Sequence, residues 1–140
     1  MLDETARGVY AIAPTPFHDD GRIDADSIDR MVDFYREAGC DGITVLGIMG
    51  EAPKLEQSEA VAIAAQVIRR ANGMPVIVGV SAPGFAAMRG LARAAMEAGA
   101  AGVMIAPRPR SEPTIRSSAI TPRPSRRSGA TCRSWSRIIR

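Results

Sequence analysis

The stretch that sets the fold is Ile43-Thr44-Val45-Leu46-Gly47-Ile48-Met49-Gly50-Glu51. Its first four residues form an apolar run, and a long helical pattern follows. Residues 47–51 are therefore predicted to be the turn that leaves the carboxyl end of a strand, where α/β proteins tend to place ligand sites. Two glycines that flank two residues let a backbone turn sharply and present N–H groups to an anion. Gly-x-x-Gly turns are common, so a plain strand-to-helix connection is the alternative interpretation.

The same alternation of strand and helix extends to both sides of this turn. Apolar runs predict strands at residues 9–13, 43–46, 75–80 and 102–106. Helical patterns begin at residue 24, ending before Gly39, and cover residues 57–71 and 85–97. The predicted apolar helix faces are, in order, Ile28, Met31, Val32 and Tyr35; Val61, Ala64, Ala65 and Ile68; and Met88, Leu91, Ala92 and Ala95.

Repeated βα units at intervals of about 30 residues indicate a parallel α/β fold. The phrase Ala38-Gly39-x-x-Gly42 returns as Ala98-Gly99-x-x-Gly102. Because no Gly-x-Gly-x-x-Gly motif follows the first strand, a (β/α)₈ barrel is favoured over a doubly wound sheet. A barrel needs roughly 250 residues, so this sequence supplies about half of one.

Charge divides the chain at residue 107. Residues 1–107 hold nine Lys and Arg against fourteen Asp and Glu, a net of −5, whereas residues 108–140 hold nine Arg and one Glu, a net of +8. We therefore expect a partial barrel at 1–107 and a separate, disordered Arg/Ser/Pro-rich tail at 108–140. Cys40 and Cys132 form no disulfide framework, the N-terminus is acidic, and no apolar run approaches membrane-spanning length. These features predict a cytoplasmic protein without a membrane segment.

Two side chains are candidates for chemistry outside the turn. His18, the single histidine, stands among loop residues with no second His or Cys nearby, so we interpret it as solvated rather than as a metal ligand. Lys54, the single lysine, follows the turn in Ala52-Pro53-Lys54-Leu55, where a solvated loop position is the ordinary interpretation. The sequence therefore predicts no metal site.

Five motifs in order resemble the dihydrodipicolinate synthase / N-acetylneuraminate lyase family. They are Gly8 to Phe17 with its Thr15-Pro16-Phe17, Ala38-Gly39-Cys40-Asp41-Gly42-Ile43, Gly47-Ile48-Met49-Gly50-Glu51, Pro75-Val76-Ile77-Val78-Gly79-Val80 and Ala98-Gly99-Ala100-Ala101-Gly102-Val103. The resemblance covers about residues 7–107. It implies a TIM barrel, a homotetramer, and class I aldolase or lyase chemistry on pyruvate or a related 2-oxo acid, with no metal or other cofactor.

In that family the turn usually reads Gly-Thr-Thr-Gly-Glu or Gly-Ser-Thr-Gly-Glu and holds the substrate carboxylate. The resemblance therefore implies a substrate-binding role for Gly47, Ile48, Met49 and Gly50. Ile48 and Met49 carry no hydroxyl, so a hydroxyl relay through these positions is excluded and a 2-oxo acid other than the synthase substrate is favoured. The family's Schiff-base lysine and its tyrosine would both lie beyond the fourth strand, and the Lys54 position is not where the family keeps its lysine. We accordingly predict no catalytic residue in this chain and expect an inactive fragment.

The tail admits three interpretations. It contains nine Arg and seven Ser in 33 residues, which suits a nucleic-acid-binding arm or a solvated tail without function. Alternatively, it is the product of a frameshift near Pro107-Arg108, in the gene or in its recorded sequence. When codons are regrouped to start on the third base of their predecessors, residues 131–140 permit Asp-Val-Pro-Val-Val-Val-Gln-Asp-Tyr-Pro, residues 119–121 permit Tyr-Tyr and residues 112–115 permit Thr-Asp-Asp. These match the family at the expected spacing, so we favour the frameshift, with the nucleic-acid arm as the alternative function.

Overall fold

The computed structural model describes residue 2 and residues 4–106. Four strands alternate with three α-helices and one short 3₁₀ helix: β1 (Tyr10–Ile12), α1 (Ala25–Glu37), β2 (Gly42–Val45), η1 (Ala52–Lys54), α2 (Gln57–Ala71), β3 (Val76–Gly79), α3 (Phe85–Glu97) and β4 (Gly102–Met104). All the strands and α-helices expected from the sequence are present. Only η1, a single turn containing Pro53, was not expected. The predicted tail at 108–140 lies outside the described residues.

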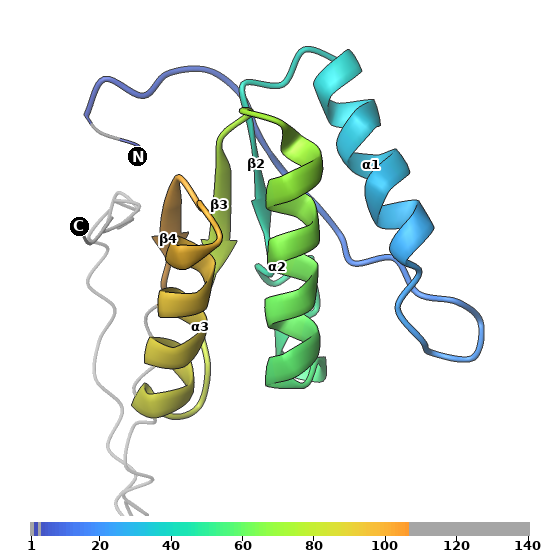
Figure 1. Cartoon of the computed structure of the whole chain (residues 1–140), viewed down its shortest axis with the longest axis vertical. Coiled ribbons are helices and arrows are strands. Elements are labelled where there is room, and N and C mark those ends of the chain that lie inside the picture. The colour runs from blue at the N-terminus through green and yellow to red at the C-terminus, as the bar shows by residue number, and fades with distance from the viewer. Residues whose placement is uncertain (1, 3, 107–140) are drawn as a thin grey trace, which may run out of the picture.

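The strands form one parallel sheet in the order β1-β2-β3-β4. Each strand lies beside the next one along the chain, and α1, α2 and α3 all cover the same face of the sheet (Figure 1). Consecutive parallel strands joined by helices on one face are the arrangement of the N-terminal half of a (β/α)₈ barrel. The prediction of a half barrel is therefore confirmed for this part of the chain.

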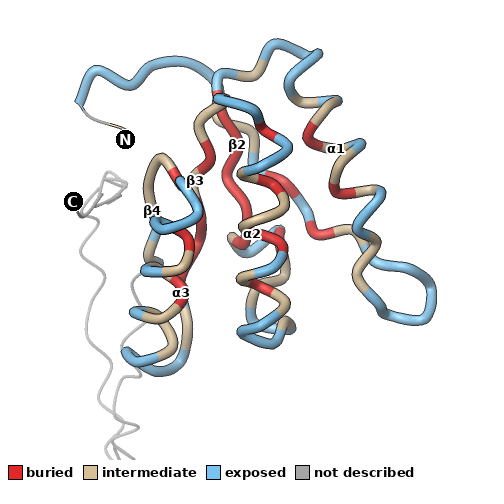
Figure 2. Tube along the Cα trace, viewed as in Figure 1, coloured by how far each residue is buried: buried red, intermediate tan, exposed pale blue. Residues whose placement is uncertain are grey.

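The core lies between the sheet and its helices. Ile43, Val76 and Val78 point from the strands toward the helices and are at most 3% exposed. Ile28 and Val32 of α1 belong to the same core and have no exposed surface. Figure 2 shows buried segments along β2 and β3 and on the helices. Burying such aliphatic side chains contributes about 1.5–3 kcal/mol each, so this layer is the main source of stability in the described fold.

The repeated phrase of the sequence ends a helix and begins a strand in both places. Ala38 and Ala98 cap α1 and α3, and the glycines that follow them, Gly39 and Gly99, adopt φ of 78° and 100°. A left-handed residue after a helix is most easily supplied by glycine, which has no Cβ to clash. The repeat therefore marks the same local turn before β2 and before β4.

The buried face of α2 differs from the one expected. Ala60, Ile63 and Val67 are buried, whereas the predicted Val61 and Ile68 are only partly buried against the core. α2 packs between two helices as well as on the sheet, so its apolar stripe is wider than one face. The prediction included Ala64, which is 1% exposed, and missed the other buried residues of the stripe.

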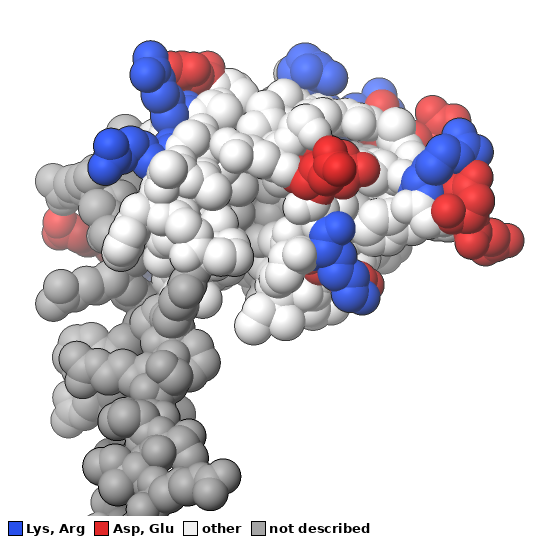
Figure 3. Space-filling view, turned by 90° about the horizontal axis from the view of Figure 1, so that it is seen from below, with Lys and Arg blue, Asp and Glu red and all other residues white. Residues whose placement is uncertain are grey.

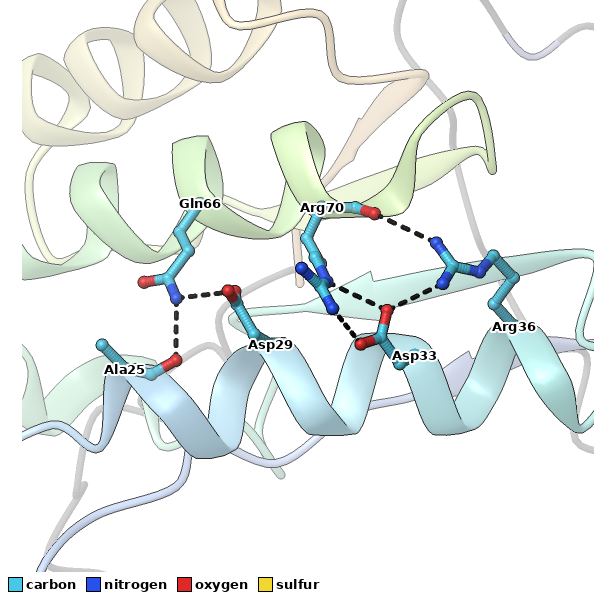
Figure 4. A network of polar contacts seen from close by, with 6 residues as sticks. All are labelled: Ala25, Asp29, Asp33, Arg36, Gln66 and Arg70. Carbon is cyan, nitrogen blue, oxygen red and sulfur yellow. Dashed lines mark hydrogen bonds and ion pairs between the residues drawn. The ribbon is translucent and has the colours of Figure 1, made fainter.

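A polar network joins α1 to α2 on the outer surface (Figure 4). Asp33 accepts hydrogen bonds from Arg70 and, at 2.8 Å, from Arg36, while the Gln66 amide donates to Asp29 and to the Ala25 carbonyl. The hydrogen bond from Arg70 holds the pKa of Asp33 below its ordinary value of 3.8, with Arg36 adding to the effect. These contacts fix the two helices side by side.

The N-terminal segment crosses the sheet at the end where the strands begin. The Leu2 N–H donates to the Ala101 carbonyl at 2.9 Å, just before β4. Figure 1 shows this segment passing from β1 over the amino ends of the other strands. The N-terminal segment, which leads into β1 at one edge of the sheet, thus contacts the residue just before β4 at the other edge. Among the described helices, none has both the length and the apolar character needed to span a bilayer.

Candidate functional site

The predicted turn lies at the carboxyl end of β2, and its backbone is constrained. Leu46 and Glu51, which bracket Gly47–Gly50, have φ of 56° and 52°. Left-handed conformations are costly for residues that carry a Cβ, and they persist only where surrounding contacts fix them. Leu46 is 2% exposed, so packing of its side chain supplies such a contact.

Two neighbours fix the turn from outside it. The Thr15 hydroxyl, which is 8% exposed, donates to the Gly50 carbonyl at 2.7 Å from the loop after β1. At the end of β3, a Cβ placed on Gly79 would lie 2.2 Å from the Leu46 carbonyl oxygen. Gly79 therefore permits an approach that no other residue would allow, and the turn rests against both neighbouring strands.

The backbone N–H groups of the turn are possible hydrogen-bond donors to a ligand. Among the described residues, no acceptor pairs with the backbone N–H groups of Gly47, Ile48 and Met49. Ile48 is 89% exposed and Met49 is 58% exposed, so the side chains of this segment extend outward. Unpaired N–H groups in a tight turn can bind an anion such as a carboxylate.

Beside the turn lies a hollow of about 280 Å³ lined by the carboxyl ends of all four strands. Ile12, Met49 and Met104 contribute apolar surface, and Ser81 contributes a hydroxyl, which accepts the Ala106 N–H at 2.8 Å. Figure 3 looks at the molecule from below, onto the end where the strands finish in Figure 1, and much of this surface is uncharged, with most charges toward its rim. The hollow can therefore accept a small molecule with an apolar portion next to an anion-binding turn.

Lys54 lies outside this hollow. Its side chain is 74% exposed and forms an ion pair with Glu51. A lysine that attacks a carbonyl is usually desolvated in its site, whereas Lys54 is exposed. The solvated position expected from the sequence agrees with the structure.

His18 is also exposed, and the described residues contain no group of three or more His, Cys, Asp or Glu positioned to hold a metal ion. Its N–H donates to the Arg22 carbonyl at 2.8 Å, within the loop that precedes α1. His18 thus contributes backbone contacts to that loop. Cys40 is half-buried, and Cys132 lies outside the described residues.

The sequence prediction placed Gly47, Ile48, Met49 and Gly50 at the carboxyl end of a strand, and the structure puts them there. It missed Thr15 and Gly79 as supports of the turn. Thr15 was noted only as part of a motif, and Gly79 only as part of a strand. A glycine at the end of an otherwise β-branched run was the available signal for a close backbone approach.

Comparison with known proteins agrees with this architecture. Residues 5–108 match the model of the dihydrodipicolinate synthetase family. The 4-hydroxy-tetrahydrodipicolinate synthase of Nitrosococcus oceani is 42% identical over 87 residues, which cover 61% of this chain and 30% of that protein. The crystal structure of dihydrodipicolinate synthase from Rhodopseudomonas palustris superposes with a TM-score of 0.71 and 72% identity, over 73% of this chain and 34% of that one.

A third similar structure carries a ligand. YagE, a member of the dihydrodipicolinic acid synthase family from E. coli K12 solved in complex with pyruvate, is 31% identical with a TM-score of 0.64, over 69% of this chain and 34% of that one. The described part of the chain thus has the fold of a corresponding part of these structures. The chain belongs to the dihydrodipicolinate synthetase family. It spans about a third of the length of the relatives it matches.

Proposed function

We propose that residues 1–107 are the first half of a Schiff-base lyase or aldolase that acts on pyruvate or a related 2-oxo acid, and that the turn Gly47–Gly50 binds the substrate carboxylate. The observation that carries the proposal is the set of N–H groups at the carboxyl end of β2 that have no acceptor among the described residues. Pyruvate bound to a family member, YagE, supports the substrate class. The two cysteines, which form no disulfide framework, support a cytoplasmic location.

Backbone groups would carry the binding here. The side chains of Ile48 and Met49 offer no hydroxyl, so they can neither donate to a carboxylate nor relay a proton. The apolar hollow beside them favours a substrate whose remainder is hydrocarbon rather than charged. The 2-oxo acid is therefore proposed to differ from that of the synthases.

The chain by itself is proposed to be inactive. Schiff-base formation needs an amine nucleophile, and Lys54 is the single lysine of the sequence. Its exposure and its ion pair with Glu51 make it a poor nucleophile. The family's homotetramer is accordingly not proposed for this fragment.

We further propose that the tail from residue 108 is the product of a frameshift. The match to the family model ends at residue 108, where the charge of the sequence also changes sign. The test is to sequence the DNA across the codons for Pro107 and Arg108 and translate the downstream frames. A neighbouring frame that encodes the family's tyrosine motif and then a strand lysine supports the proposal, and the absence of both in every frame contradicts it.

Carboxylate binding is tested by titrating the isotopically labelled full chain with pyruvate and following backbone amide resonances. We expect Gly47, Ile48 and Met49 to shift. Methyl pyruvate is the matched control because it keeps the ketone but lacks the negative charge, and it should leave these resonances in place. Equal shifts with both ligands, or shifts confined to other residues, would contradict the proposed role of the turn.

Inactivity is tested by incubating the chain with pyruvate and sodium borohydride and measuring its intact mass. No adduct is expected, while the Rhodopseudomonas palustris enzyme serves as the positive control. A reduced adduct on Lys54 would overturn the proposal that this chain lacks a nucleophile.

The second candidate function is nucleic-acid binding, which nine Arg against one Glu in residues 108–140 favour. Binding through phosphates weakens steeply as salt rises, because counterions are released. Salt-dependent binding to duplex DNA or RNA that disappears when residues 108–140 are deleted would support it. If no such binding occurs, this alternative is rejected.

A further inference from the structure

One peptide group in the turn is held at both of its polar ends. The Gly50 carbonyl oxygen accepts the Thr15 hydroxyl at 2.7 Å. The Glu51 N–H, on the other side of the same peptide bond, donates to the Ile48 carbonyl at 3.1 Å. Because a peptide group is planar and its C=O and N–H point in opposite directions, these two hydrogen bonds fix its orientation.

The same peptide lies where the turn closes on its own start. A Cβ placed on Gly50 would lie 2.9 Å from the Leu46 nitrogen, so a side chain at this position would require the backbone to shift. Between these two contact points run residues 47–49, whose N–H groups have no acceptor among the described residues. A movement of Gly50 therefore changes the direction in which those N–H groups point.

The Thr15 hydroxyl comes from a segment that is itself stiff. Thr15 stands between Pro14 and Pro16, whose rings fix φ, and a residue that precedes proline is restricted to extended conformations. The Ala13 N–H donates to the Thr44 carbonyl at 2.9 Å, which ties this segment to β2. Thr15 is also buried, so its hydroxyl has little access to water. The donor is therefore held in place before any ligand binds.

We propose that Thr15 is a positioning residue for the anion-binding turn. Gly47, Ile48 and Met49 line the hollow, whereas neither Thr15 nor Gly50 is among its described lining residues. Thr15 acts without touching the ligand, because its hydrogen bond keeps the N–H groups of those three residues in the orientation that a carboxylate needs. Donors that are already oriented bind an anion more tightly, since binding costs no rearrangement. The inference rests on the carboxylate-binding role proposed above for the turn.

The composition of the turn increases the importance of this hydrogen bond. Ile48 and Met49 carry a hydrocarbon and a thioether side chain, so within this segment a carboxylate is bound by backbone N–H groups alone. A side-chain donor can change rotamer to follow a ligand, but the direction of a backbone N–H is set by its peptide. The Thr15 hydrogen bond is therefore expected to control ligand affinity as well as stability.

The test is the Kd of the isotopically labelled full chain for pyruvate, measured from the amide resonances of Gly47, Ile48 and Met49. Thr15→Val keeps the shape of the side chain but removes the donor, and it should weaken binding about fivefold or more, because a buried carbonyl is left unpaired. Thr15→Ser keeps the donor and should bind within about twofold of the unsubstituted chain. The same resonances should move in Thr15→Val even without pyruvate.

Thr44→Val is the matched control. Thr44 is also a buried threonine, at 6% exposed, but its hydroxyl donates to no described residue. The same substitution there should leave the Kd for pyruvate unchanged. Urea unfolding of each variant separates stability from affinity. A lower stability of Thr15→Val with an unchanged Kd in its folded form would show a merely structural hydrogen bond and overturn the proposal.

A second pair of variants serves if Thr15→Val does not fold. Thr15→Ala and Thr15→Ser both lack the methyl group, and only the serine keeps the hydroxyl, so the alanine variant should bind pyruvate about fivefold more weakly than the serine variant. Equal affinities for these two would overturn the proposal.

The positioning role and the carboxylate-binding role fail in different ways. Absence of pyruvate-induced shifts in the unsubstituted chain would contradict the role of the turn, and the inference about Thr15 with it. Binding by the unsubstituted chain that Thr15→Val leaves unchanged would overturn the positioning role alone. A loss of binding in Thr15→Val that Thr15→Ser shares would also overturn it, because the hydroxyl would then not be the cause.

Discussion

The two faces of the sheet are built from the same four strands and differ in how far their side chains are buried. On the helix-covered face, Ile43 and Val78 have no exposed surface, whereas Ile12 on the open face is 51% exposed. The covered face is closed by helices that follow each strand in sequence, so its partners are local. The open face faces no described helix. Local βα packing can thus stabilise half a barrel, while closure requires strands from elsewhere.

The largest expected effect comes from truncating the covered face. Ile43→Ala should reduce the free energy of unfolding by about 2–5 kcal/mol, because it removes methyl groups from a filled core and leaves a cavity. Ile12→Ala makes the same change on the open face and should cost less than about 1 kcal/mol in a single chain. Urea unfolding monitored by circular dichroism measures both. Equal costs for the two variants would show that the two faces do not differ as described.

A smaller loss of stability is expected from a substitution at Gly79, at the end of β3. Gly79→Ala places a Cβ 2.2 Å from the Leu46 carbonyl oxygen, so the turn or the strand must shift, at a cost of about 1–3 kcal/mol. Amide resonances of residues 46–50 should move with it. Gly84→Ala is the matched control because no atom lies within 4 Å of its added Cβ and its φ is −115°, which alanine adopts freely. Similar losses for both variants would show that close approach at Gly79 is not the cause.

The smallest effect is expected on the outer surface of the helices. The pKa of Asp33 is held below its ordinary 3.8 by the hydrogen bond from Arg70, so the associated stabilisation is complete above pH 3.8. It is lost as pH falls from 3.8 through the lowered pKa of the folded state. Asp33→Asn should therefore flatten the fall in stability over this acidic window and leave both sheet faces intact.

The measurement for this variant is thermal unfolding as a function of pH. Asp20→Asn is a useful comparison, since the Asp20 pKa is lowered by Arg22 within a loop and joins no helices. An unchanged pH profile for Asp33→Asn would mean that the α1–α2 ion pairs contribute nothing to stability.

Periodicity was sufficient to predict the elements because strand and helix periods depend on local sequence. The residues expected to face the sheet on α1 and α3 include Ile28, Val32, Leu91 and Ala95, and all four are buried. On α2 the buried Ala64 was expected, but Ile63 and Val67 were missed because α2 contacts α1 and α3 as well as the sheet. That packing is set by residues distant in sequence, which a pattern within one helix does not contain.

The site was predictable in position and less so in conformation. Two glycines after an apolar run indicated the turn Gly47–Gly50. The left-handed backbone of Leu46 could not be predicted, because a leucine carries no local preference for it and the contacts that accompany it come from other strands. The hydrogen bond from Thr15 joins residues 35 positions apart, so only the assembled fold shows it. The frameshift and the boundary at residue 107 stay predictions.

The hydrogen bond from Leu2 to Ala101 sets an order of events during synthesis. Chains are made at roughly 5–20 residues per second, so residue 2 leaves the ribosome on the order of 5 to 20 seconds before residue 101 does. Until then the amino-terminal segment has no place to dock, and the amino ends of the strands stay uncovered. Translation speed, rather than the intrinsic folding rate, therefore sets the earliest time at which this end of the sheet can be sealed, and slower translation lengthens its exposure to chaperones and proteases.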